Sequence, residues 1–176
     1  MEIEFQGQYD KATVFKAVAL ANKPSKRNSL IRIGLTVLFV AIYATYFITV
    51  ADKDGLSSFE ILRSGRHLIT LPFIAYFLLQ PYISSFFAAS NLWKNPNMQK
   101  PLAGVISDQG IVYISLSKSR REIAWESFAK KRISEDLIVL LTADGVLSFF
   151  PRHFFKTEAD WKRVKQWVDF KVAETA

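Results

Sequence analysis

Basic side chains are the residues of this sequence whose types and spacing favour a binding chemistry. They occur in the loop Lys118-Ser-Arg-Arg121 and the run Lys130-Lys-Arg132, which could bind phosphoinositol-like or other anionic phosphates. Near an anionic surface each exposed cation contributes on the order of 1 kcal/mol, so several together would dock a domain without a specific pocket. A solvated basic face is the alternative, because charge runs are not a phosphate-cradling motif.

Arg152 has two possible roles, since it could face a lipid headgroup or pair with an acidic residue such as Glu126. Taken together, the candidate residues for lipid or partner binding are Lys118, Arg120, Arg121, Lys130, Lys131 and Arg152.

Catalytic and metal-binding patterns are missing from the sequence. The chain has no Gly-x-Ser-x-Gly, Walker or Rossmann motif. It has no cysteine, which excludes disulfides, thiolate zinc sites and a cysteine nucleophile. Its two histidines, His67 and His153, fall on opposite sides of the membrane in the topology derived below, so a two-histidine metal site is not expected. We therefore predict no enzyme, no cofactor and no metal.

Two long apolar segments within Leu30–Ala89 organise the rest of the chain. The first, Ile33–Val50, has no charge and covers roughly 27 Å at a helical rise of about 1.5 Å per residue, close to the thickness of a bilayer core. The second, His67–Ala89, has no acidic or basic residue after its histidine, although Pro72 and Pro81 should bend it or end it early. Core helices of a soluble protein would carry polar residues along one side, and neither segment does. The sequence predicts a transmembrane hairpin with spans at about 31–50 and 67–89.

The basic residues at the ends of the hairpin indicate its orientation. Met1–Arg32 contains six basic and three acidic residues, and Lys94–Ala176 contains fourteen and ten, whereas the connection Ala51–Arg66 is balanced. The positive-inside bias then places both termini in the cytoplasm and the connection outside. Because no cleavable signal peptide is visible, we expect the first span to act as a signal anchor in a bacterial inner membrane. The formal charge of +7 could also suggest nucleic acid, but no nucleic-acid motif accompanies it, so that partner is not expected.

The segments around the hairpin have the periodicities of a small soluble domain. Ile3–Tyr9 alternates like a short strand, which would join a sheet formed by the other end of the chain. Asp10 is suited to cap a helix over Lys11–Asn22. After the second span, Trp93 beside Lys94 could lie at the membrane interface or pack on the soluble domain.

From Leu102 onward the apolar residues recur with the period of strands. Gly110 is expected to supply the positive φ of the first hairpin turn, and Asp144-Gly145 forms another turn. Thr157 would cap a closing helix, which buries one face. That face contains Trp161, Val164, Val168 and Val172. The predicted strands are Gly104–Ser107, Ile111–Leu116, Glu122–Trp125, Phe128–Ile133, Leu137–Leu141 and Val146–Phe150.

These elements predict an α+β membrane protein, with a two-helix transmembrane hairpin and a small antiparallel β domain of pleckstrin-homology-like type capped by a C-terminal helix. Residues 1–29 are a cytoplasmic strand and helix, residues 30–90 the hairpin, and residues 101–173 the cytoplasmic β domain. With a strand on each side, the hairpin is interpreted as a long insertion in one cytoplasmic domain. Thr45 and Gln80 are candidates for contacts between membrane helices, because an ion path would usually carry ionisable groups.

Several pieces of the chain, taken in order, resemble the YcxB-like proteins of bacteria. They include the two-span hairpin, Gly104–Ile111, the Ile-x-Trp pattern of Ile123–Trp125 and the Phe-x-Pro-Arg-x-x-Phe pattern of Phe149–Phe155. The resemblance covers nearly the whole chain and implies a cytoplasmic pleckstrin-homology-like domain beside two membrane helices. It brings no established activity and no catalytic residues.

Two functions follow from these observations. The first is a non-enzymatic bacterial inner-membrane protein that presents its cytoplasmic domain to anionic lipid headgroups, to a protein partner or to a second copy of itself. The second is a small membrane immunity protein that protects against a toxin or pore through its hairpin. The second function predicts that the spans and the Ala51–Arg66 connection matter, while the soluble domain tolerates change.

Overall fold

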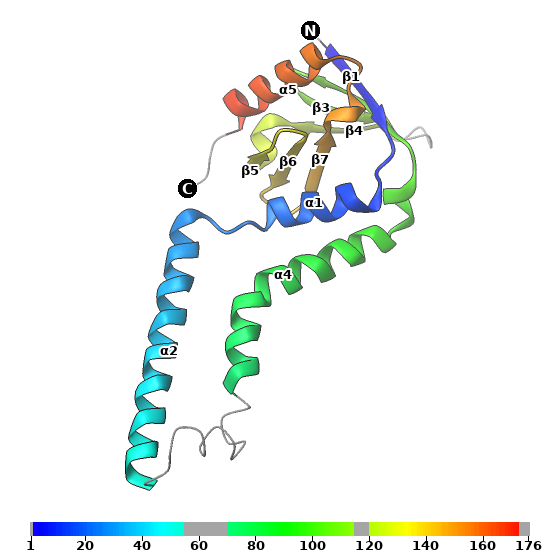
Figure 1. Cartoon of the computed structure of the whole chain (residues 1–176). Coiled ribbons are helices and arrows are strands. Elements are labelled where there is room, and N and C mark those ends of the chain that lie inside the picture. Colours follow the sequence, from blue (N-terminus) through cyan, green and yellow to red (C-terminus); the bar gives the residue numbers. More distant parts are fainter. Residues whose placement is uncertain (1, 55–69, 115–119, 173–176) are drawn as a thin grey trace. The chain divides into compact units, whose positions relative to one another are not determined.

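The computed structural model describes residues 2–54, 70–114 and 120–172 (Figure 1). The chain divides into two compact units. Met1–Lys23 and Ser85–Ala176 form the first, here called the α/β unit, and Pro24–Ser84 forms the second, the helical unit. Lys118, His67 and most of the Ala51–Arg66 connection lie outside the described residues.

The α/β unit contains a four-stranded antiparallel sheet in the order β1-β2-β3-β4. Its strands are β1 (Glu2–Gly7), β2 (Leu102–Ser107), β3 (Gly110–Ile114) and β4 (Arg120–Ala124). β1 pairs with β2 so that Ile3 lies opposite Ile106. The expected pairing of the N-terminal strand with the far end of the chain is therefore confirmed.

A second antiparallel sheet has the order β5-β6-β7. It consists of β5 (Phe128–Ile133), β6 (Leu137–Thr142) and β7 (Leu147–Pro151). The four residues from Leu137 to Leu140 are all buried, because β6 is the central strand and α1 packs on it. An isolated bridge between Phe5 and Phe155 ties β1 to the segment after β7. The coarse class expected from the sequence, α+β with antiparallel strands, is confirmed.

Two capped helices cover these sheets. The side chain of Asp10 accepts a hydrogen bond from the Thr13 backbone nitrogen at 2.6 Å and caps α1 (Lys11–Ala21). Thr157 accepts one from the Asp160 backbone nitrogen at 3.1 Å and caps α5 (Glu158–Lys171). Both caps were predicted. The predicted buried face of the closing helix is also confirmed, and its members are Trp161, Val164, Val168 and Val172.

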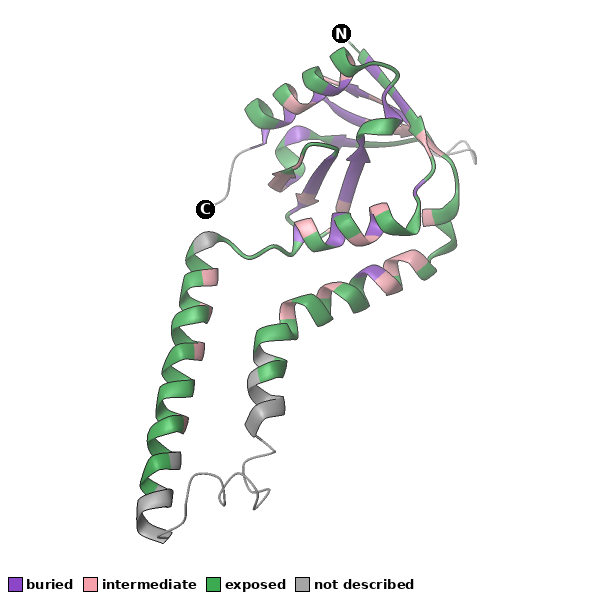
Figure 2. Ribbon diagram, in the orientation of Figure 1, coloured by how far each residue is buried: buried purple, intermediate pink, exposed green. Residues whose placement is uncertain are grey.

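Buried residues, purple in Figure 2, lie on the strands and helices of the α/β unit, and its core is built from large aromatic and branched side chains. Trp125 and Trp161 are each about 1% exposed, and Phe150 is fully buried. Both indole nitrogens are satisfied, since Trp125 Nε1 donates to the Ser107 backbone oxygen at 3.0 Å and Trp161 Nε1 donates to that of Glu135 at 3.2 Å. A buried Trp needs such a partner to avoid an unpaired donor.

The two turn glycines have different roles. Gly145 has φ +84°, which matches the prediction for the Asp144-Gly145 turn. The prediction for Gly110 is wrong, because Gly145 is the one glycine with positive φ among the described residues. A Cβ at Gly110 would instead collide with the Ile123 backbone oxygen and lie 3.0 Å from the Ala124 Cα, so this glycine permits the close approach of β4.

The helical unit contains α2 (Lys26–Asp54) and the first part of α4 (Thr70–Lys94). α2 exposes apolar side chains along its length (Figure 2), and its segment Arg27–Tyr46 is long and apolar enough to cross a membrane. It is the one such helix found in the described part of the chain. The second predicted span is therefore not confirmed. Its predicted end also differs, because α4 continues to Lys94 and Ala89 is buried in the α/β unit.

Candidate functional site

Lys130 and Lys131, predicted as part of one basic surface, point in opposite directions. They are neighbours on β5, so their side chains leave opposite faces of the strand. Lys130 Nζ donates to the Ala21 backbone oxygen at 3.4 Å, at the end of α1. Lys131 Nζ donates to the Asp169 backbone oxygen at 2.5 Å and lies 3.0 Å from its carboxylate, in the last turn of α5. Helix C-termini have unpaired carbonyls and a negative dipole end, so each lysine caps a helix.

Arg152 has an acidic partner, but the partner is not Glu126. Its guanidinium lies 2.5 Å from the Glu158 carboxylate in the first turn of α5. Lys16 forms a similar pair with Asp136 at 2.5 Å, and this hydrogen bond lowers the pKa of Asp136. Arg152 thus belongs to a group of compensated charges around a cavity of about 430 Å³, which His153 also lines. The cations Lys16, Arg152 and Lys156 of this cavity are thus each paired with a carboxylate.

Arg120 and Arg121 lie on β4 and face opposite sides of the four-stranded sheet. Arg121 is opposite Tyr113 on β3, and Ile123 is opposite Ile111. Both isoleucines are buried, so their face is the one that meets the core. Arg121 shares that face because it is two residues from Ile123, whereas Arg120 projects from the other face.

The face that carries Arg121 lines a cavity of about 710 Å³ in the α/β unit. Strands β3, β4 and β7 contribute to it, together with the segment from η1 (Pro96–Gln99) to the start of β2. Most of its wall is apolar. The apolar side chains include Met98, Leu102, Ile123, Leu147 and Phe149. A mostly apolar cavity with a few polar groups is the common form of a small-molecule site.

Six polar side chains also line this cavity, namely Tyr9, Asn97, Lys100, Tyr113, Arg121 and Ser148. Burial raises the pKa of Tyr113 to about 12, although a hydrogen bond with Ser148 and the charge of Arg121 act in the opposite direction. The phenol is therefore neutral at pH 7 and can donate a hydrogen bond. Its ring is held by a stacked contact with Phe150, with centroids 6.1 Å apart, and an edge contact with Phe5 at 5.8 Å.

Chemically, this arrangement can bind an anion beside an apolar group. Arg121 supplies a permanent positive charge and Tyr113 a neutral donor on the neighbouring strand. Among the described residues, no cluster of three histidine, aspartate or glutamate side chains could hold a metal ion.

Sequence reasoning missed most of the cavity. Lys100, Tyr113 and Leu147 come from distant parts of the chain, and no local pattern indicates that they meet. One signal was present but unused, because extension of the predicted strand Glu122–Trp125 by one residue would place Arg121 on the same face as Ile123.

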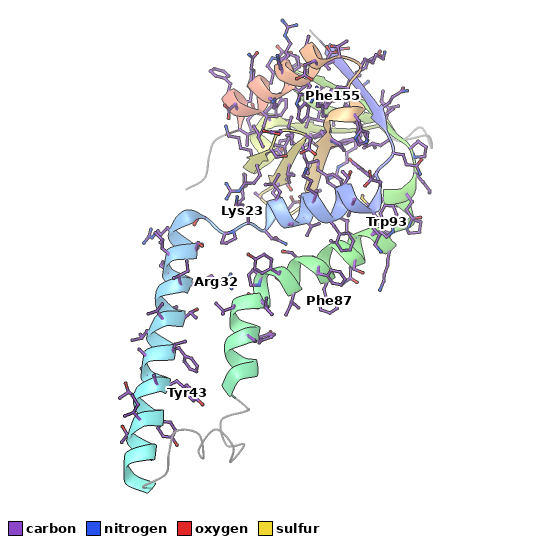
Figure 3. All side chains as sticks on the ribbon, viewed as in Figure 1. Lys23, Arg32, Tyr43, Phe87, Trp93 and Phe155 are labelled. Atoms are coloured by element: carbon purple, nitrogen blue, oxygen red, sulfur yellow. The ribbon has the colours of Figure 1, made fainter. Side chains whose placement is uncertain are left out.

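The candidates for membrane helix contacts lie in the helical unit. Thr45 Oγ1 donates to the Ala41 backbone oxygen of its own helix at 3.0 Å, and Gln80 is exposed on α4. Trp93, in contrast, packs against the core of the α/β unit (Figure 3). This placement matches the second of the two predicted roles for Trp93.

Three comparisons, with protein-family models, curated proteins and solved structures, found no match for the chain.

Proposed function

We propose that this protein is a membrane-anchored, non-enzymatic binding protein of the bacterial inner membrane. In this proposal α2 and the apolar part of α4 form a two-span hairpin with both chain termini in the cytoplasm. The α/β unit is then presented at the cytoplasmic face to bind an anionic lipid or a protein partner. The observation that carries the proposal is the exposed apolar surface of α2.

The exposure along α2 is too extensive for an ordinary surface helix. Leu30, Val37 and Ile48 are 69%, 62% and 67% exposed, and they are separated by several turns. None of the apolar segment Arg27–Tyr46 is buried. Contiguous apolar surfaces of this kind are covered by lipid or by another protein, because water is a poor solvent for them.

The polar features of α2 also support a membrane position. Arg27 and Arg32 lie near its N-terminal end, where basic side chains can reach the headgroups of the inner leaflet. The three threonines that follow donate to backbone oxygens of their own helix. Hydrocarbon requires that such groups be satisfied internally.

For the second span the support comes from the first part of α4. Tyr76 and Leu79 are exposed on it, and Pro81 lies within the helix. Proline is tolerated in membrane helices when neighbouring groups satisfy the freed carbonyls. The Ser84 hydroxyl is satisfied within the same helix, since it donates to the Pro81 backbone oxygen at 3.2 Å.

The α/β unit supports the binding part of the proposal. A four-stranded and a three-stranded antiparallel sheet, followed by a C-terminal helix, form the arrangement expected of a pleckstrin-homology-like domain. Membership of the YcxB-like family is also part of the proposal.

Fractionation of bacterial cells that produce the full chain tests the membrane anchor. We expect the protein in the membrane pellet, resistant to alkaline carbonate and released by mild detergent, because α2 would be buried in hydrocarbon. A chain that is recovered in the soluble fraction, or that carbonate releases, would contradict the proposal. A soluble cytoplasmic protein and a resident two-span protein from the same cells serve as controls.

A further inference from the structure

We infer that the cavity lined by Arg121 and Tyr113 binds an amphiphile with one acyl chain and a carboxylate head, such as a long-chain fatty acid. The head lies at Arg121 and the chain along the apolar wall. The inference deepens the proposed function by naming a ligand class and a site, and it rests on that function for the supply of the ligand from an adjacent bilayer.

The charge of Arg121 is the first step of the argument. Arg121 is exposed and yet lines the cavity from the inner face of β4, so it stands at the cavity mouth. None of the ion pairs among the described residues includes it. The nearby carboxylate of Asp144 already accepts a hydrogen bond from Thr142, which is the main cause of its lowered pKa. Arg121 therefore remains available to an incoming anion.

The Tyr113 hydroxyl adds a second donor for the head. Tyr113 and Arg121 are direct partners across the β3–β4 ladder, and their side chains share one face. Two donors on neighbouring strands suit the two oxygens of a carboxylate, and a charged acceptor makes such hydrogen bonds stronger than neutral ones.

Most of the remaining wall favours an apolar group. Leu102, Ile123 and Leu147 line the cavity together with Phe149, and these side chains offer no hydrogen bonds to a sugar, a base or a peptide. The volume of about 710 Å³ lies within the range of roughly 300–1,000 Å³ that is common for small-molecule sites. An acyl chain meets both conditions.

Lys100 raises the possibility of a different anion. It lines the same cavity, so that two cations could hold inorganic phosphate or a phosphate headgroup without use of the apolar wall. Competition separates the two ligands. A phosphate site would be blocked by inorganic phosphate alone, whereas a fatty-acid site would be blocked only by a molecule with both a carboxylate head and an acyl chain.

The test uses the full chain in nanodiscs of zwitterionic phosphatidylcholine. A C16 carboxylate with a diazirine near its chain end is added, activated by light, and its crosslinks are mapped by mass spectrometry. We expect labelled peptides around Leu102 and Leu147. Unlabelled palmitate should compete, whereas hexadecanol and inorganic phosphate should not.

Two adjacent arginines form a matched pair of variants. Arg121→Gln should reduce this labelling by about tenfold, the effect of a lost charge-assisted hydrogen bond. Arg120→Gln makes the same change in net charge on the opposite face of β4 and should leave labelling unchanged. Arg121→Lys should restore most of it, and near-UV circular dichroism of the tryptophans checks that each variant is folded.

Equal labelling of the Arg121→Gln and Arg120→Gln proteins would overturn the inference, as would competition by hexadecanol or by inorganic phosphate. If Arg121→Gln does not fold, Leu102→Trp replaces it, because the indole would fill the cavity and should abolish labelling. A chain that does not enter nanodiscs would contradict the proposed membrane anchor instead. The failure of the inference and that of the proposed function are thus separate results.

Discussion

The α/β unit and α2 are both rich in large apolar side chains, but they place them in opposite ways. In the α/β unit Trp125 and Trp161 are about 1% exposed, whereas on α2 Leu30 is 69% exposed. A core buries apolar surface against other parts of the same chain. α2 lacks such a cover within its own unit, so the proposal assigns that cover to lipid.

The two regions also differ in where their polar groups find hydrogen-bond partners. In the α/β unit, helix ends are satisfied by side chains from elsewhere, as when Lys131 reaches α5. In α2 the Thr36 hydroxyl donates to the Arg32 backbone oxygen at 2.8 Å, and that of Thr49 to the Thr45 oxygen at 2.8 Å. α2 therefore satisfies these hydroxyls locally, as a helix surrounded by hydrocarbon must do.

The contrast predicts a large effect of core truncation and none of the same change on α2. Phe150→Ala should lower the free energy of unfolding of the α/β unit by about 3–5 kcal/mol, because Phe150 is fully buried. Phe39→Ala, at a side chain 49% exposed on α2, should leave it unchanged. Urea unfolding of the detergent-solubilised chain can be followed by tryptophan fluorescence, since all four tryptophans lie in the α/β unit. If Phe150→Ala lowered the free energy of unfolding by less than about 1 kcal/mol, the contrast between a packed α/β unit and an uncovered α2 would be contradicted.

A charge introduced into each region should have a large effect on membrane insertion in α2 and none in the α/β unit, the opposite order to the effect of truncation on unfolding. Leu38→Lys on α2 should cost about 2.5–3.5 kcal/mol of membrane insertion and move protein out of the membrane fraction. Ala143→Lys, at an exposed turn of the α/β unit, should have no effect on this fraction. Quantitative blotting of membrane and soluble fractions gives the comparison, and equal distribution of the two variants would count against a lipid-covered α2.

Glycines sharpen the contrast at the level of the backbone. A Cβ at Gly104 would lie 2.5 Å from the Phe5 ring and collide with the Val112 backbone oxygen, so Gly104→Ala should destabilise the α/β unit by about 1–3 kcal/mol. Gly34→Ala is the control, because nothing lies within 4 Å of its added Cβ. Urea unfolding should separate the two variants, and similar midpoints would show that the sheet accommodates the methyl group.

The smallest effect is expected at a helix cap. Lys131→Met should cost about 0.3–1 kcal/mol, because it removes a cation from the C-terminal end of α5. Lys162→Met removes an exposed lysine of the same helix and should be neutral. The difference between their urea midpoints measures the cap. A larger loss of stability in the Lys162→Met protein than in the Lys131→Met protein would contradict the capping role of Lys131.

Local patterns predicted the elements well. The strand Phe128–Ile133 and the caps at Asp10 and Thr157 follow from alternation and from short-range hydrogen bonds, which depend on adjacent residues. The role of Gly110 was predicted wrongly, because a glycine that a turn requires and a glycine that allows two strands to approach closely have the same local sequence. Only the pairing of β3 with β4 separates the two.

The site was harder to predict than the fold. Lys130 and Lys131 read as one charge run along the sequence, yet a strand sends adjacent side chains to opposite faces, and each meets a helix end far away in the chain. The cavity joins Lys100, Tyr113 and Phe149, so its existence depends on the packing of distant segments. Arg121 was the one cavity residue that the sequence analysis named as a candidate for binding.

The accessibility of single cysteines tests the central claim most directly, because the chain has no cysteine of its own. Leu38→Cys and Ala143→Cys proteins are treated with a membrane-impermeant maleimide in intact cells, in permeabilised cells and after denaturation. We predict that Ala143→Cys is labelled once the cells are permeabilised, and Leu38→Cys only after denaturation. Labelling of Leu38→Cys at the rate of Ala143→Cys in permeabilised cells would contradict the placement of α2 in the bilayer.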